Sequence, residues 1–295
     1  MGINTSIATL LSRAREQGTS FRNTLTIGRQ SMAVPVADLA RLVAKFGLDD
    51  ANPDAVATAE WADDFLRQCL GADTVTSMDY SDYQSASLVH DLNQPVPAEW
   101  QEQFDAVIDG GTIEHIFDIR QTLANYMTMV KVGGSLFVAA PANNLCGHGF
   151  YQFSPEFFYR VFSSENGFRV RDMVLIESPL LSVEASRHQR FFRVQDPEVL
   201  QKRVQILSRK PVMLWAHAER VSSVPLFAAS PYQSDFKAQW RAAATSHESD
   251  APTGEGDGQR GGFRYLSRWK EAQKRFRQWR KHGLHRGKFV SPFDP

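Results

Sequence analysis

FDAVIDGGTIEHIFDIRQTLANYMTMVKVGGSLFVAAP, residues 104–141, has the pattern of a complete strand–helix–strand unit. Apolar runs at 104–108 and 136–140 are typical of parallel strands that are buried on both faces. Between them, apolar side chains recur at helical spacing: Ile119, Leu123, Tyr126, Met127 and Val130. Asp118 is placed to cap this helix, and Gly133-Gly134 to end it. We therefore expect an α/β fold built on a parallel sheet.

Polar residues follow the first strand of this unit and mark where a ligand is expected. In open α/β sheets, ligands bind beyond the carboxyl ends of the strands. The side chains expected at that position are Asp109, Gly110, Gly111, Thr112, Glu114 and His115. Any chemistry of this chain should therefore lie near this loop.

The same stretch belongs to a longer series of motifs in a fixed order. They are Ile113-Glu114-His115-Ile116, Val130-Lys131-Val132-Gly133-Gly134, His148, Phe153-Ser154-Pro155-Glu156 and Gly167-Phe168. This series resembles motif four through strand five of class I S-adenosylmethionine-dependent methyltransferases, and the segment that follows in that family. The resemblance covers roughly residues 21–220, and it is strongest over 104–170.

The resemblance implies a Rossmann-like, doubly wound sheet of seven strands, mostly parallel with one antiparallel strand. Candidate strands are 25–28, 74–78, 86–90, 104–108, 136–140, 168–176 and 212–216. Candidate helices besides the central one are 35–46, 53–70, 154–162 and 197–207. Apolar residues from Ile3 to Ala14 add a helix within residues 1–20, and the methyltransferase-like domain is expected over 21–230.

The loop after the first strand departs from the family. Gly28 matches its first glycine, but the chain continues Arg29-Gln30-Ser31-Met32 where a Gly-x-Gly-x-Gly run is usual. Glycines there let the backbone approach a cofactor closely, so this loop needs a wider shape or a different cofactor pose. A tight strand-to-helix turn with no ligand remains an alternative.

Acidic residues after the next two strands match the family's cofactor contacts. Asp79 corresponds to the acid that accepts hydrogen bonds from the ribose hydroxyls, with Asp82 and Tyr83 as alternatives. Asp91 corresponds to the acid on the adenine side, with Leu92 as a ring-packing neighbour. Turn or helix-cap roles remain open for both aspartates. The implied cofactor, S-adenosyl-L-methionine, is thus expected to contact Gly28, Arg29, Asp79, Asp91, Leu92, Asp109 and Gly110.

Methyl transfer is an in-line displacement, so the protein aligns the acceptor and removes its proton where it has one. His148, His115 and Glu114 are the candidate catalytic groups, with His148 preferred, and roles within the fold stay open for all three. The loop after residue 141 is dense in amides and rings, which suits an acceptor site at Asn143, Asn144, Tyr151 and Gln152. No metal is expected, because His148 and Cys146 lack two further ligands at suitable spacing.

Composition narrows the class of protein further. The chain has 295 residues, 42% hydrophobic and 22% charged, and no apolar run approaches the ~18 residues of a membrane helix. Two distant cysteines fit a reducing compartment, so we expect a cytoplasmic protein. No nucleophile elbow or Walker loop is present, which disfavours hydrolase and kinase activities.

The C-terminal part differs from the rest in charge. Residues 259–295 hold eleven Lys or Arg and two acids, which leaves 22 basic and 31 acidic residues elsewhere. We expect a flexible linker over 231–262 and a basic amphipathic tail over 263–295. Such a tail could contact an anionic membrane peripherally, dock on the acidic body or stay disordered; its Trp and Phe stripe disfavours nucleic acid.

Two functions follow as hypotheses. The first is a methyltransferase that uses S-adenosyl-L-methionine and acts on a small molecule or a glycan-type acceptor. The second is a methyltransferase-like binding or scaffold protein without catalysis, which the missing glycines after Gly28 favour. A nicotinamide-binding enzyme is a distant third, because the chain has no Gly-x-Gly-x-x-Gly run.

Overall fold

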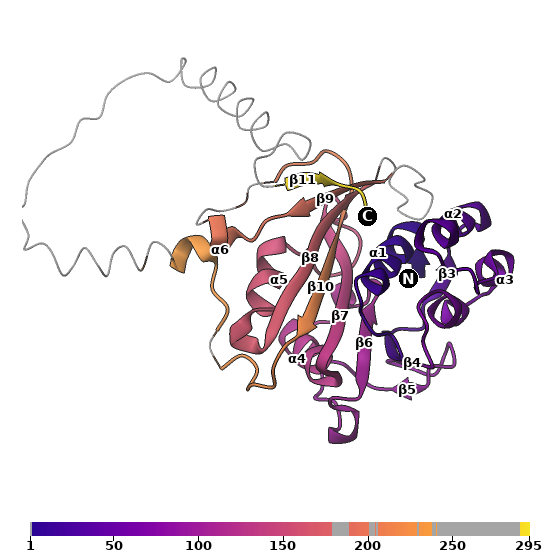
Figure 1. The fold of residues 1–295 in the computed structure, drawn as a ribbon. Coiled ribbons are helices and arrows are strands. Elements are labelled where there is room, and N and C mark those ends of the chain that lie inside the picture. Colours follow the sequence, from indigo (N-terminus) through magenta and orange to yellow (C-terminus); the bar gives the residue numbers. More distant parts are fainter. Residues whose placement is uncertain are drawn as a thin grey trace, which may run out of the picture.

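The computed structural model describes residues 2–178, 189–200, 204, 206–228, 230–237, 240 and 290–295. Within these residues a nine-stranded sheet, in the order β11-β9-β8-β10-β7-β6-β2-β4-β5, lies between two helical layers (Figure 1). Its strands are β2 Asn23–Ile27, β4 Thr74–Asp79, β5 Leu88–Val89, β6 Phe104–Asp109, β7 Val130–Asn143, β8 Phe168–Glu177, β9 Arg190–Val194, β10 Val212–Arg220 and β11 Val290–Phe293.

The sheet is largely parallel, as the sequence predicts. Strands β5, β4, β2, β6 and β7 run in one direction, and β10 is inserted antiparallel between β7 and β8. The described sheet has two strands more than the seven expected, because β9 and β11 extend it beyond β8. Both are short, and β11 contains Pro292, which suits a sheet edge and hides the strand pattern.

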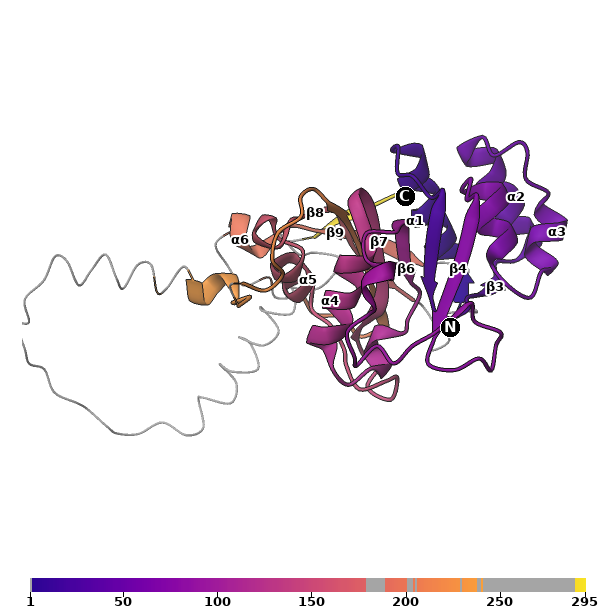
Figure 2. The same ribbon diagram turned by 90° about the horizontal axis from the view of Figure 1, so that it is seen from below.

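Helices cover both faces of the sheet (Figure 2). Helices α4 Ile119–Met129 and α5 Pro155–Val161 pack on one face, in a core with Tyr126, Leu136 and Phe158. The opposite core, with Phe137 and Trp215, is covered by α1 Thr5–Glu16, α2 Val36–Phe46 and α3 Pro53–Thr58. Burial of both faces explains why the central strands are continuous apolar runs.

The strand–helix–strand unit forms as predicted at its start and differs at its end. The side chain of Asp118 caps α4 by accepting a hydrogen bond from Gln121 N at 2.9 Å. The helix ends at Met129, before the glycine pair. Gly133, at φ +84°, and Gly134 instead form an irregularity within β7, where its register against β6 shifts. A Cβ at Gly134 would lie 2.8 Å from a backbone oxygen of β6, so the glycines serve strand packing.

Two predicted helices are shorter in the structure. The helix expected over 53–70 is divided into α3 and a π-helical segment, Phe65–Cys69. Between them Trp61 bridges to Ser31, and Ala62 N donates to the Gln30 carbonyl at 2.9 Å. The helix expected over 197–207 is α6 Pro197–Leu200, and residues 206–208 are not helical. Tertiary pairing to the loop after β2 therefore overrides the helical pattern near Trp61.

Chain ends also differ from expectation. Helix α1 is capped by Asn4, whose side chain accepts a hydrogen bond from Ile7 N at 3.0 Å. A short strand, β1 Gly2–Asn4, precedes it and pairs with β3 Ser31–Ala33. Most of the predicted tail, 263–289, and the Gly-rich part of the linker, 249–258, lie outside the described residues. The last residues of the expected tail form β11, a strand of the central sheet.

In the described part of the chain, no helix combines the length and the apolar character needed to cross a bilayer.

His217 on β10 is a buried titratable group that should make stability depend on pH. Its ring is 3% exposed, stacks on Phe137 at a centroid distance of 4.4 Å, and places Nε2 3.1 Å from Ser135 Oγ. Burial lowers the pKa of His217 from 6.5 to about 3. The unfolded chain therefore binds more protons than the folded one below pH 6.5, and stability falls as the pH is lowered.

We expect this group alone to lower the free energy of unfolding by about 2 kcal/mol between pH 6.5 and pH 5, since each unit is worth ~1.4 kcal/mol. Urea unfolding at the two pH values measures the loss. The variant His217→Gln should lose less over the same range, whereas His90→Gln, at the surface, should match the unaltered chain. Equal losses in all three proteins would contradict the assignment.

Candidate active site

The carboxyl ends of β2, β4 and β6 lie side by side at the point where the order in which the chain adds strands reverses. Strand β2 lies between β4 and β6, and the chain first adds β4 and β5 on one side before it adds β6 and β7 on the other. Gly28 follows β2 at φ +71°, and its N donates to Met78 O at 2.6 Å. A Cβ on Gly28 would lie 3.3 Å from Thr112 Oγ1 and 3.9 Å from Asp79 Oδ2. This is the position at which doubly wound sheets bind ligands.

Asp79 ends β4 and is half-buried beside this point. Its Oδ1 accepts a hydrogen bond from Tyr80 N at 2.7 Å, while Oδ2 is the oxygen that faces Gly28. A carboxylate is an acceptor only, so Oδ2 suits a ligand hydroxyl. The structure thus brings Gly28 and Asp79 together, as the sequence reasoning expected of cofactor contacts.

Asp109, at the end of β6, has a different role from the one its sequence position suggests. Its side chain is fully buried, and Oδ1 accepts from Gly111 N at 2.9 Å and Thr112 N at 2.6 Å. Oδ2 accepts from Ile113 N and from Tyr126 Oη, both at 3.0 Å. Burial outweighs these hydrogen bonds and raises the pKa of Asp109 to about 6. Asp109 therefore holds the loop that carries Glu114 and His115.

Gln30 fills the space where the family has a glycine. It is 2% exposed, and its Nε2 donates to Ile27 O at 2.7 Å and to Gly28 O at 3.3 Å. A Cβ on Gly110 would lie 2.3 Å from Gln30 Oε1, so the amide is wedged between the loops after β2 and β6. Sequence analysis noted the missing glycines but did not identify Gln30 as the group that replaces them.

Arg29 crosses from the loop after β2 toward β5. Its guanidinium lies over the ring of Trp61 at 4.6 Å and donates to Gln84 O at 2.9 Å. The side chains of Arg29 and Gln30 thus contact neighbouring loops of the protein along the carboxyl edge of the sheet.

Asp91 and Leu92 are engaged within the fold. Asp91 Oδ1 accepts from Asn93 Nδ2 at 2.7 Å and from Asn93 N at 3.0 Å, and these hydrogen bonds lower the pKa of Asp91. Leu92 is buried in the core beneath α4. The turn role that sequence analysis left open for Asp91 accounts for these contacts.

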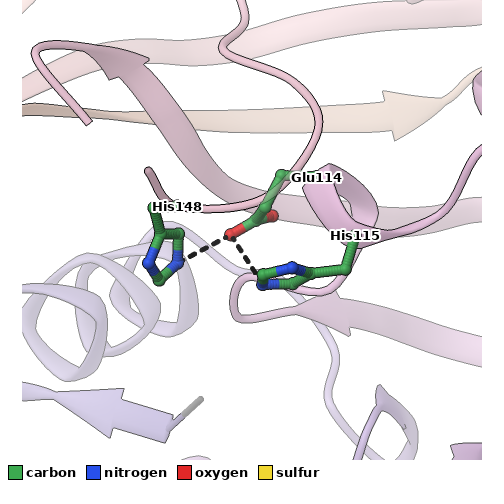
Figure 3. A group of neighbouring side chains, drawn as sticks. All are labelled: Glu114, His115 and His148. Atoms are coloured by element: carbon green, nitrogen blue, oxygen red, sulfur yellow. Dashed lines mark ion pairs between the residues drawn. The ribbon is translucent and has the colours of Figure 1, made fainter. Parts of the chain in front are cut away.

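Glu114, His115 and His148 converge, as Figure 3 shows. Glu114 and His115 lie in a 3-10 turn after β6, and His148 comes from the loop after β7. Glu114 Oε1 lies 3.4 Å from His148 Nε2 and 3.9 Å from His115 Nε2, and the two rings are 5.3 Å apart. All three residues named as candidate catalytic groups therefore form one cluster. Its ligand atoms lie within 4.8 Å of one another.

The three residues of this cluster differ in how far solvent reaches them. The Glu114 side chain is fully buried, whereas the two histidine side chains are about half exposed. Burial, with the nearby charge of Asp109, raises the pKa of Glu114 to about 8. Burial and the proximity of His148 lower the pKa of His115. The cluster thus joins a buried carboxyl group to two imidazoles that solvent reaches.

The residues expected to bind the acceptor mainly shape their own loop. Asn144, at φ +56°, donates to Ser208 O and Lys210 O. The other three residues also bond within this region. Asn143 Oδ1 accepts from Asn144 N, and Gln152 Oε1 accepts from Leu145 N. Tyr151 Oη donates to Phe117 O. Phe150, one of the rings that sequence analysis noted in this loop, is 70% exposed, and Phe117, which it did not assign to the site, is 77% exposed. Exposed rings near the carboxyl edge of a sheet indicate a binding surface, and the spacing of apolar residues in the sequence does not reveal that they are exposed.

The arrangement β5-β4-β2-β6-β7-β10-β8, with β10 reversed, is the doubly wound order that the resemblance implies. The fold is that of class I methyltransferases. No protein-family model matches the chain, and no curated protein matches its sequence.

Solved structures of methyltransferases and a related transferase are similar to the chain. N-methyltransferase NodS from Bradyrhizobium japonicum is 13% identical with a TM-score of 0.39, over 74% of this chain and 96% of that one. The C9 mutein of the branched-chain polyamine synthase from Thermus thermophilus is 12% identical with a TM-score of 0.38, over 77% of this chain and 58% of that one. The chain thus spans less than two thirds of the synthase. Identities this low say nothing of the reaction or substrate.

Proposed function

We propose that this protein transfers a methyl group from S-adenosyl-L-methionine to a small-molecule or glycan-type acceptor. The observation that carries the proposal is the meeting of Gly28, Asp79 and Thr112 at the point where the sheet changes direction. A glycine at positive φ lets the backbone approach a ligand closely beside a carboxylate oxygen, once the Gln30 amide moves. The cofactor, when bound, supplies an electrophilic methyl group on a sulfonium.

The chain's own residues fit distinct tasks in this reaction. Asp79 Oδ2 would accept hydrogen bonds from vicinal hydroxyls, and Gln30 would move aside when the crevice fills. His148 would take a proton at Nε2 from the acceptor, since its side chain is half exposed and lies against Glu114. Phe117 and Phe150 offer ring faces for an apolar part of the acceptor.

We also propose that this protein is cytoplasmic. The two cysteines are free thiols, which fits a cytoplasmic protein. A peripheral membrane contact of the basic segment stays a prediction, because most of that segment lies outside the described residues.

Asp79→Ala should weaken binding of S-adenosylhomocysteine about tenfold or more, the loss expected when a charged hydrogen-bond acceptor is removed. Calorimetry on the full chain measures the affinity directly. Asp82→Ala, in the exposed turn that follows β4, is the control and should bind as the unaltered chain does. No heat from the unaltered chain at high ligand concentration would contradict the cofactor, and a larger loss at Asp82 would move the ribose contact to that residue.

A second candidate function is a methyltransferase-like binding protein without catalysis. The buried Gln30 amide at the crevice is the observation that favours it. Transfer of a labelled methyl group to any component of a cell extract would rule it out, provided that the transfer is lost in a variant lacking the His148 ring.

A further inference from the structure

We propose that Glu114, His115 and His148 bind a divalent transition-metal cation of the zinc or iron(II) kind. The binding itself does not depend on the proposed methyl transfer. Three observations support it: the spacing of the three ligand atoms, the state of the Glu114 carboxylate and the chemistry of the donor set.

The spacing is close to what a bound ion requires. Ligand atoms that lie about 2.0–2.2 Å from a tetrahedral metal are roughly 3.4 Å from one another. Glu114 Oε1 and His148 Nε2 are 3.4 Å apart, and Glu114 Oε1 and His115 Nε2 are 3.9 Å apart. All three ligand atoms lie within 4.8 Å of one another, so the half-exposed His115 ring has to turn toward the other two ligands to complete the site.

The Glu114 carboxylate lacks the partners that a buried acid needs. Its side chain is fully buried, yet neither Oε1 nor Oε2 has a hydrogen-bond partner among the described residues. Burying such a group without compensation costs several kcal/mol. In Figure 3 the carboxylate points between the two imidazoles, so a cation held by all three groups would compensate it.

The backbone around Glu114 is fixed by the loop that supplies His148. Phe150 N donates to Glu114 O at 2.7 Å, and a Cβ on Gly149 would lie 2.8 Å from the same oxygen. Gly149, at φ +82°, thus permits the two loops to touch where the ligands meet. The backbone of the two loops that carry the ligands is thus held together without an ion, and the half-exposed histidine rings complete the site when they turn toward Glu114.

The donor set selects the class of cation. Two imidazole nitrogens and one carboxylate oxygen suit zinc or iron(II), whereas magnesium and calcium prefer sites made of oxygen ligands. The sequence expectation of no metal rested on the pairing of His148 with Cys146. In the structure His148 lies against Glu114 and His115, and the exposed Cys146 is not part of the cluster.

Three protein ligands leave coordination positions open on the side where the histidines are exposed. A hydroxyl group bound there would lose its proton more readily, because a cation lowers the pKa of a bound oxygen acid. On the proposed function, the acceptors best suited to this site therefore carry a hydroxyl group. With the cation bound, Nε2 of His148 is a ligand, so the cation replaces His148 as the group that activates the hydroxyl. This point rests on the proposed function, and the binding of the cation does not.

The test uses the untagged full chain, stripped of metal with a chelator. Titration with Zn²⁺ by calorimetry should show one site per chain, and Co²⁺ should give the visible absorption of a low-coordinate complex. His148→Ala and Glu114→Gln should each weaken binding at least tenfold and remove the Co²⁺ band. His90→Ala, a histidine outside the cluster, should change neither measurement.

His148 is exposed, so His148→Ala should fold even if the buried Glu114→Gln does not; circular dichroism checks both. Equal Zn²⁺ binding by the unaltered chain and by His148→Ala, or no binding by the unaltered chain, would overturn the proposal. All titrations omit S-adenosylhomocysteine, so the metal site and the proposed methyl transfer can fail independently.

Discussion

Replacing Asp109 by alanine should lower the free energy of unfolding by about 4 kcal/mol or more. Its carboxylate accepts four hydrogen bonds, three from backbone N–H groups of the following loop and one from Tyr126 Oη. Without it these donors lie in a buried region with no acceptor, and each costs roughly 1–3 kcal/mol. Urea unfolding followed by circular dichroism measures the loss, which would approach the whole stability of an ordinary domain.

Two variants test the reason for this loss. Asp109→Asn keeps one acceptor oxygen and should lose about half as much. Asp105→Ala, on the same strand, removes one hydrogen bond to Asn23 N and an exposed ion pair with Lys131, and should cost about 1 kcal/mol. If Asp109→Ala were no more harmful than Asp105→Ala, the loop would have another support.

Gln30→Ala should raise the affinity for S-adenosylhomocysteine roughly 30-fold. In the unaltered chain a ligand in the crevice must displace the Gln30 amide and break its hydrogen bonds to Ile27 O and Gly28 O, at about 1 kcal/mol each. Calorimetry of the two proteins under the same conditions gives the ratio.

The control is Gln30→Met, which keeps the length of the side chain but lacks both hydrogen bonds, so it should gain as much affinity if those bonds are the obstacle. A gain in Gln30→Ala alone would identify the filled volume as the obstacle. Unchanged affinity in both variants would show that the ligand and Gln30 occupy different places.

Much of the fold could be predicted because its signals are local. The apolar runs of β6 and β7, the Asp118 cap of α4 and the Ser154 cap of α5 depend on residues close together in the chain. Such signals act before any tertiary contact forms, so the parallel sheet and its two helical layers follow from them.

The features that sequence analysis missed depend on distant contacts. The break near Trp61 arises from pairing with Ser31, and Gln30 is buried only because the loops after β2 and β6 meet. In the site, the closeness of Glu114 and His148 could be inferred from strand order, since both follow neighbouring strands. The missing hydrogen bonds of the Glu114 carboxylate could not, because they depend on the packing of every group around it.

Strand β11 shows that the basic C-terminal segment includes a strand of the central sheet. Phe293 lies under the guanidinium groups of Arg13 and Arg193, at 4.8 and 4.4 Å from the ring centroid, and β11 pairs with β9. The last residues of this segment are therefore part of the folded body. A truncation after residue 258 would strip an edge strand from the sheet and leave the backbone of β9 uncovered, ready to associate with another chain. An internal deletion that rejoins the chain before Val290 would remove the basic residues and keep β11 in the sheet, so it would test the charge of this segment alone.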